Sequence, residues 1–266
     1  MEDMENKIIG QNKIISQINS FDLDTCPRSI ILMGKKGSGR HLISEYISNH
    51  LEVELVNLTN KLTLDTITNA MLSVEPKVYY IDTQNISVKS QNTILKFLEE
   101  PTPNCIIILL VENLSSLLDT VVNRCQVFEL EKYDKSTLSL FADNEEILKY
   151  SETPGDVIEL SGENFDEYKR LSSLILSSLE KASISNTLTL TDKFDSKTGE
   201  LNLTLFLKVF IKYIMDAVMS NSSKKYMDIY DLTNKLISDL KINSNQNRLM
   251  DKYLIELKSV MRFYGD

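Results

Sequence analysis

The chain has 266 residues, which is enough for two or three small domains. Its content of 42% hydrophobic and 25% charged residues is typical of a globular protein in water. The net charge of −9 argues against bulk attraction to nucleic acid, because a phosphate backbone repels such a surface on average. Any contact with DNA therefore requires a local patch or a partner subunit.

Signals for a membrane or secreted protein are missing from the sequence. No apolar run approaches the ~20 residues that a membrane helix needs, and the acidic stretch at residues 1–7 is unlike a signal peptide. The 3 cysteines lie far apart, so they predict no metal-ligand pair and indicate a reducing compartment. We expect a cytoplasmic protein with no membrane contact and no metal site of its own.

Short apolar runs alternate with amphipathic stretches over the first 131 residues. Four runs are rich in branched residues: SIILMG (29–34), VYYID (78–82), CIIILLVEN (105–113) and QVFELE (126–131). A fifth run, LEVELVNL (51–58), alternates more and predicts an outer strand. Continuous apolar strands are typical of a parallel sheet that is covered by helices on both faces. With helical stretches at 39–51 and 87–100, the pattern predicts an α/β fold.

The second half of the chain is predicted to be helical. Residues 132–163 indicate two or three short helices, and Pro154-Gly155 ends one and starts the next. From residue 164 onward, apolar residues recur at every third or fourth position, which predicts long amphipathic helices. The polar stretch 183–202 predicts a linker between two of them.

The stretch ILMGKKGSGRHL (30–41) has the spacing of a phosphate-binding loop between a strand and a helix. Glycines in such a loop let backbone N–H groups converge on phosphate oxygens. Where a working loop has a lysine and then a hydroxyl, this chain has Arg40 and His41, and His41 offers no oxygen ligand to Mg²⁺. A glycine turn without any ligand explains the stretch equally well. The candidate binding residues here are Gly34, Gly37, Ser38, Gly39, Arg40 and His41.

The strand VYYID ends in Asp82, which completes the set of candidate binding residues. An acidic residue at this place orients Mg²⁺ in many phosphate-loop ATPases. The next residue is Thr83, which cannot act as a general base near neutral pH. A buried strand with an ordinary aspartate at its end is the alternative.

The run at residues 90–130 resembles bacterial DNA polymerase III clamp-loader subunits of the gamma and delta-prime type. These carry an Asn-x-Leu-Leu-Lys-x-Leu-Glu-Glu-Pro run and, after the next strand, a Ser-Arg-Cys motif. The chain has Asn92, then Ile-Leu-Lys at 94–96 and Leu-Glu-Glu-Pro at 98–101. It then has Asn123-Arg124-Cys125, with asparagine in place of serine. The two glutamates of the first motif, taken by themselves, are expected to be solvated residues at a helix end.

The likeness covers nearly the whole chain and is strongest over residues 76–131, while residues 8–18 look like the segment that packs near the adenine. It implies an AAA+ α/β module at residues 1–131. A small helical lid is expected at residues 132–163, and a helical collar that joins a ring of subunits at residues 164–266.

Several positions depart from the pattern of the subunits that hydrolyse ATP. Besides Arg40 and His41 in the loop, Thr83 stands at the catalytic glutamate and Val111 at the strand-end sensor of the γ-phosphate. Asp156 stands where a lid arginine follows Pro-Gly. Since losing one such group costs ~10²-fold or more in rate, the resemblance implies a delta-prime type without its own hydrolysis. If the loop binds a ligand, we expect a phosphate, ATP or ADP held without turnover.

Arg124 corresponds to the arginine finger that the family presents to a neighbouring subunit. A guanidinium offers permanently charged, bidentate donors to a γ-phosphate in trans. The resemblance thus implies a catalytic role for Arg124 at ATP and Mg²⁺ held by the neighbour. The alternative is an arginine that satisfies the last carbonyls of a helix.

The implied partners are the other clamp-loader subunits in a hetero-oligomeric ring and the sliding clamp, with primed DNA bound mainly through the assembled complex. Two rival functions stay open at this point. One is an ATP-hydrolysing gamma-type subunit in which Arg40 replaces the lysine. The other is a different phosphate-loop enzyme, such as a small kinase, and the long helical half of the chain argues against it.

Overall fold

Two compact units make up the protein: Met1–Asp143 with Ser151–Val157, and Asn144–Tyr150 with Ile158–Asp266. The computed structural model describes residues 8–59, 61–84, 86–162, 165–181, 194, 201, 203–221, 223–242 and 246–264. The acidic stretch at residues 1–7 and most of the predicted linker lie outside these ranges. The predicted lid contributes residues to both units, so a separate lid domain stays a prediction.

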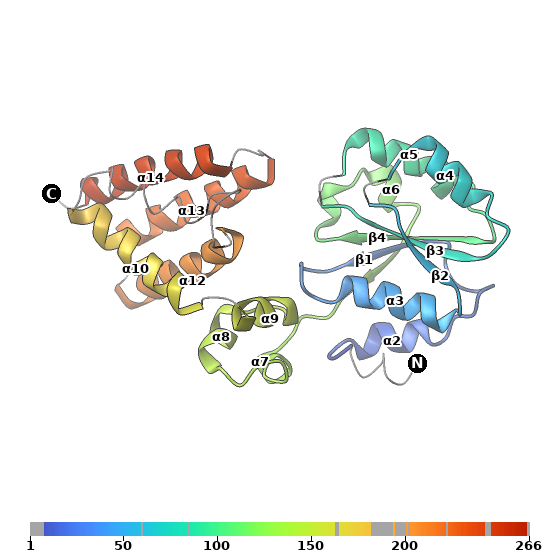
Figure 1. The fold of residues 1–266 in the computed structure, drawn as a ribbon, viewed down its shortest axis with the longest axis horizontal. Helices are drawn as coiled ribbons and strands as arrows, with labels where there is room; N and C mark the ends of the chain where they lie inside the picture. Colours follow the sequence, from blue (N-terminus) through green and yellow to red (C-terminus); the bar gives the residue numbers. More distant parts are fainter. Residues whose placement is uncertain are drawn as a thin grey trace. The chain divides into compact units, whose positions relative to one another are not determined.

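The first unit is built on a parallel sheet of five strands in the order β2-β3-β4-β1-β5 (Figure 1). The strands are β1 (Ser29–Met33), β2 (Glu54–Asn57), β3 (Lys77–Asp82), β4 (Cys105–Val111) and β5 (Gln126–Glu129). All five predicted strands are confirmed, and the alternating run that predicted an outer strand forms β2 at one edge.

Burial explains why these segments form strands in this order. Every residue of β4 is buried, whereas the edge strand β2 has none that is fully buried. Side chains of β4 alternate between two apolar clusters: Ile106 and Ile108 belong to one, and Ile107 and Leu109 to the other. A strand that is covered on both faces must be apolar throughout, which is the pattern seen in the sequence.

Helices cover both faces of the sheet (Figure 1). On one face lie α2 (Asn12–Ile18) and α3 (Arg40–His50), and on the other α4 (Leu64–Met71), α5 (Val88–Glu99) and α6 (Asp119–Val122). Ile43 and Ile47 of α3 join the first cluster, and Ile94 and Phe97 of α5 join the second. The first unit is therefore a three-layer α/β module, as predicted.

Helix α4 is absent from the sequence-based prediction, although its start carries a recognisable signal. The hydroxyl of Thr63 accepts from the backbone N–H of Thr66 at 3.2 Å, and the hydroxyl of Thr66 accepts from the N–H of Thr63 at 2.9 Å. This reciprocal capping box satisfies two donors at the helix start. Threonine in place of the usual glutamate or glutamine made the signal easy to miss.

The second unit is helical. Its helices are α8 (Glu145–Tyr150), α10 (Phe165–Lys181), α12 (Leu203–Asn221), α13 (Lys224–Ile242) and α14 (Gln246–Phe263), and α9 (Pro154–Gly162) passes into it from the first unit. A further short helix, α7 (Lys135–Leu138), belongs to the first unit. The core of the second unit contains the fully buried rings of Tyr168, Phe206 and Phe210. The predicted long helices are confirmed.

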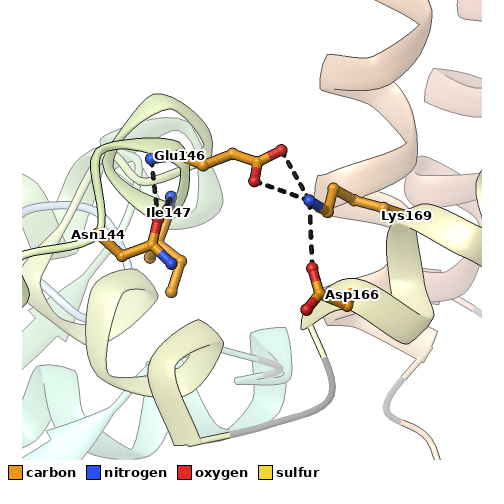
Figure 2. A network of polar contacts seen from close by, with 5 residues as sticks. All are labelled: Asn144, Glu146, Ile147, Asp166 and Lys169. Carbon is orange, nitrogen blue, oxygen red and sulfur yellow. Dashed lines mark hydrogen bonds and ion pairs between the residues drawn. The ribbon is translucent and has the colours of Figure 1, made fainter.

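Helix α8 is tied to α10 by a polar network (Figure 2). Asn144 accepts from the backbone N–H groups of Glu146 at 3.0 Å and Ile147 at 3.3 Å, which satisfies the start of α8. The ammonium of Lys169 donates to both carboxylate oxygens of Glu146 at 2.7 Å and lies 3.2 Å from a carboxylate oxygen of Asp166. The hydrogen bond from Glu146 raises the pKa of Lys169. The network thus orders the first helix of the second unit.

None of the helices in the described ranges is both long and apolar enough to span a membrane.

The reactivity of the three cysteine thiols provides a test of the packing of the first unit. Burial raises the pKa of Cys26 to about 11, and the pKa values of Cys105 and Cys125 to about 12. Because only the thiolate reacts, we expect native protein at pH 8 to react with iodoacetamide roughly 100-fold or more slowly than a free thiol. Urea should restore ordinary reactivity, and rapid labelling of native protein would contradict the burial.

The same pKa shifts give a pH dependence of stability. Unfolded thiols ionise above about pH 8.5, whereas the folded thiols hold their protons to higher pH. The free energy of unfolding should therefore fall as the pH rises from about 8.5 to about 11. Urea unfolding of the chain at several pH values measures this loss.

Candidate functional site

The loop at residues 34–39 joins β1 to α3, and its own geometry requires glycine. Gly37 and Gly39 have φ values of +80° and +94°, which side chains disfavour. At Gly34, a Cβ would lie 2.7 Å from the hydroxyl oxygen of Ser38, so a side chain here would force Ser38 to move. The loop thus has a phosphate-loop spacing and a tight, glycine-dependent backbone.

The start of α9 lies directly against this loop. The backbone N–H of Gly155 donates to the carbonyl oxygen of Gly37 at 3.0 Å. A Cβ added to Gly155 would lie 2.5 Å from the Cα of Gly37, which shows how closely the two backbones approach. We call this contact, between residues 35–37 and residues 152–155, the loop clasp.

Side chains extend the loop clasp. The hydroxyl of Thr153 donates to the carbonyl oxygen of Lys36 at 3.2 Å, and the ammonium of Lys35 lies 2.7 Å from a carboxylate oxygen of Glu152. That ion pair is exposed and contributes little to stability. The buried carboxylate of Asp156 accepts from the backbone N–H of Glu152 at 3.1 Å. Where the resemblance expects a lid arginine, the chain therefore places a negative charge beside the clasp.

The two polar residues that open α3, Arg40 and His41, both have carboxylate partners within the chain. Arg40 is only 7% exposed, and one guanidinium nitrogen lies 3.6 Å from a carboxylate oxygen of Glu112. The Nδ1 atom of His41 lies 3.3 Å from a carboxylate oxygen of Glu45, and its ring meets the ring of Tyr80 edge-on at 4.7 Å.

Segments that are distant in sequence make hydrogen bonds to the loop or beside it. The hydroxyl of Tyr133 donates to the carbonyl oxygen of Ser38 at 2.8 Å, and burial raises the pKa of Tyr133. The side chain of Gln11 is fully buried, and it donates to the backbone carbonyl of Glu131 and accepts from the N–H of the same residue. The hydroxyl of Ser38 is buried without a hydrogen-bond partner among the described residues.

The carboxyl end of β3 places its two polar residues in different surroundings. Asp82 accepts from the backbone N–H of Gln84 at 3.1 Å, and its own N–H donates to the hydroxyl of Thr59. Thr83 is buried, and its hydroxyl donates to the carbonyl oxygen of Leu110 at 3.0 Å. The pocket beside Asp82 includes no residue of the loop. Its lining residues are Thr59, Leu62, Asp82, Gln84, Ile86, Ser87 and Ser90.

The carboxyl end of β4 carries an apolar residue followed by a charged one. Val111, its last residue, is completely buried and apolar. The next residue, Glu112, is the partner of Arg40. Within the described ranges, no group of three or more His, Cys, Asp and Glu side chains could hold a metal ion.

Arg124 follows the short helix α6 and lies on the surface of the first unit. One guanidinium nitrogen donates to the carbonyl oxygen of Thr120 at 2.9 Å, which is the helix-end contact that the alternative interpretation expected. A second nitrogen lies 3.1 Å from a carboxylate oxygen of Glu99, at the end of α5. The Arg124 side chain is nevertheless 37% exposed, so part of it faces solvent. The helix-end contact and an outward-facing charge are thus both present.

The residue after Arg124 anchors this turn from the inside. Cys125 packs against the apolar cluster that includes Val121 and Leu117. Burial raises the pKa of the Cys125 thiol to about 12, so the side chain is neutral and behaves as a small apolar group. An inward cysteine beside an outward arginine sets which way the turn faces.

Sequence reasoning missed three contacts of this site: Glu99 with Arg124, Glu112 with Arg40, and the segment 152–155 with the loop. Glu99 is an exposed residue at the end of α5, as expected, and the structure adds its pairing with Arg124. A threonine before Pro154-Gly155 signals a helix start, because Thr caps helices and Pro suits the first turn. No local signal reveals that this helix start touches the loop.

Comparison of the sequence with known families matches residues 57–134 to the family described as "DNA polymerase III, delta subunit". The matched segment includes Asp82, Glu99 and Arg124 but not the glycine loop. The chain is also 26% identical, over 283 aligned residues, to DNA polymerase III subunit gamma of Buchnera aphidicola subsp. Baizongia pistaciae. That match covers 90% of this chain and 71% of the relative.

Solved structures share the fold at low sequence identity. A DNA polymerase III gamma subunit-related protein of Thermotoga maritima has a TM-score of 0.56 and 14% identity, covering 95% of this chain and 100% of that one. A variant of RuvB from the same organism has a TM-score of 0.53 and 16% identity, with 94% of this chain and 89% of that one covered. The likeness shows a shared fold, an α/β module with a parallel sheet followed by a helical region.

The loop clasp can be tested with one substitution. Alanine in place of Gly155 would normally favour a helix by up to ~1 kcal/mol, but its Cβ would overlap the backbone of Gly37. We expect Gly155→Ala to lower the free energy of unfolding by about 1–3 kcal/mol, as overpacking does. Urea unfolding followed by circular dichroism measures the change. Ser161→Ala, at an exposed position of the same helix, is the matched control. A Gly155→Ala protein as stable as this control would contradict the clasp.

Proposed function

We propose that the chain is a delta-prime-type subunit of a DNA polymerase III clamp loader. The match of residues 57–134 and the gamma-subunit relative support an AAA+ subunit of the clamp-loader type. One observation carries the finer assignment. Arg40 is paired with Glu112 of the same chain, while Arg124, at the finger position, is partly exposed on the surface.

In this proposal the chain does not hydrolyse ATP itself. Thr83 has no carboxylate to activate water, and its hydroxyl is committed to the carbonyl of Leu110. Arg40 is paired with Glu112, and the backbone of the loop is covered by the start of α9. A nucleotide at this loop would have to displace the loop clasp, and it would be held without turnover.

Arg124 would act on ATP and Mg²⁺ held by the neighbouring subunit. Its guanidinium carries a permanent positive charge and several N–H donors, so it can neutralise charge that develops on the γ-phosphate oxygens. Such fingers contribute roughly 10³–10⁵ in rate. The chain would thereby complete a catalytic site that it does not itself contain.

The partners follow from the same assignment. They are the other clamp-loader subunits of a cytoplasmic ring, the sliding clamp, and primed DNA through the assembled complex. The net charge of −9 favours this indirect route to DNA over binding by the isolated chain. The biological result would be the loading of the clamp during replication.

A gamma-type subunit that hydrolyses ATP is the second candidate, because the sequence relative is a gamma subunit. It requires Arg40 to serve the phosphates in place of lysine. The pairing of Arg40 with Glu112 argues against that role.

ATP turnover separates the two candidates. We expect the isolated chain to hydrolyse ATP at least ~100-fold more slowly than the reconstituted ring, because several catalytic groups are missing. Arg40→Ala in this subunit should leave the turnover of the ring within about twofold. Release of inorganic phosphate measures both. Substantial turnover by the isolated chain would support the gamma-type assignment instead.

The finger itself is tested by Arg124→Ala in a ring that contains the other subunits, the clamp and primed DNA. We expect the clamp-stimulated ATPase rate to fall by about 10³-fold, as for the loss of other arginine fingers. Stability of the isolated chain should change by less than about 0.5 kcal/mol, because the side chain is partly exposed. Lys132→Ala removes a positive charge from an exposed position of the same unit and serves as the control. Equal ATPase rates for the two variants would refute the assignment.

A further inference from the structure

The side chain of Arg124 is held by two different elements. One nitrogen of its guanidinium donates to the carbonyl of Thr120 in α6, and another contacts the carboxylate of Glu99 at the end of α5. Two contacts on separate nitrogens restrict both the position and the plane of the group. The guanidinium has further N–H donors that these two contacts do not use, and the side chain is 37% exposed.

Helix electrostatics show that Glu99 is poorly placed without a cation. A carboxylate in the last turn of a helix meets the negative end of the helix dipole, and Glu100 adds a second negative charge beside it. Arg124 supplies the positive partner at 3.1 Å. Only Glu99 of the two glutamates makes this contact in the described structure.

Stability alone does not explain the pair. The two side chains are 37% and 52% exposed, and ion pairs with such exposure contribute little to folding. What the contact does change is the freedom of Arg124. An arginine that is already oriented loses less rotamer freedom when it binds a phosphate, and correct orientation before reaction lowers the barrier.

We propose that Glu99 is a positioning residue that fixes the guanidinium of Arg124 for contact with the γ-phosphate on the neighbouring subunit. The proposal rests on the finger role of Arg124 proposed above. Glu99 itself touches no substrate. Its carboxylate and the Thr120 carbonyl together form the cradle of the finger.

The first measurement uses the isolated chain and needs no ring. The Nε–H resonance of Arg124 in NMR spectra reports how restricted the guanidinium is. We expect a distinct, ordered signal in the unaltered chain and in Glu100→Ala, and a motionally averaged one in Glu99→Ala. Equal order in both variants would overturn the proposal, since Glu99 would then restrain nothing. Urea unfolding should give the same midpoint for all three proteins.

The second measurement is the ATPase of the reconstituted ring with clamp and primed DNA. We expect Glu99→Ala to lower kcat by about tenfold or more with little change in KM for ATP, because positioning acts on the reacting geometry. Glu99→Gln, which keeps one hydrogen-bond acceptor, should retain an intermediate kcat. Glu100→Ala should match the unaltered ring. In the Arg124→Ala background, Glu99→Ala should have no further effect.

The two measurements distinguish failure of the positioning role of Glu99 from failure of the finger role of Arg124. If Arg124→Ala abolishes turnover but Glu99→Ala leaves kcat unchanged, the finger role stands and positioning by Glu99 is wrong. A rise of kcat in Glu99→Ala also overturns positioning, because Glu99 would then restrain the finger from acting. If Arg124→Ala has no effect on the ring, the finger role and the positioning proposal both fall.

Discussion

The burial of β4 on both faces is the constraint on which the first unit depends. All 7 of its residues are buried, between β3 and β1 and between two layers of helices. The parallel order makes the carboxyl ends of the strands meet at one edge, where ligands bind in open α/β sheets. Asp82 is the last residue of β3, and the loop, Thr83 and Glu112 directly follow strand ends. Chemistry at this edge is therefore decided by a few residues just beyond the strands.

The loop and the residue that follows it make contacts with other segments of the same chain. Glycine geometry at Gly37 and Gly39 is that of a loop whose backbone can approach another group closely. The group that approaches is the start of α9, through Gly155, and the arginine that opens α3 turns to Glu112. An internal hydrogen bond thus joins the loop to the start of α9, and an ion pair joins Arg40 to Glu112, which follows β4.

The turn at residues 123–125 sends two adjacent side chains in opposite directions. Cys125 is partly buried and packs against the apolar cluster, while Arg124 lies outside and is held by Glu99 and the carbonyl of Thr120. Under the finger role proposed above, a charged group held at a defined place on the surface would serve a second molecule.

The sequence by itself determined the five strands, the long helices and the glycine spacing of the loop, because period, burial and φ preference are local properties. Helix α4 was not predicted, and its capping box uses Thr66 in place of the usual glutamate or glutamine. Partners far apart in sequence could not be predicted: Gly155 on Gly37, Glu112 beside Arg40, and Glu99 beside Arg124. These contacts join different elements, and only the folded sheet with its helices brings them together. Residue type thus set which groups are present, and the tertiary structure decided which of them are engaged inside the chain and which remain at its surface.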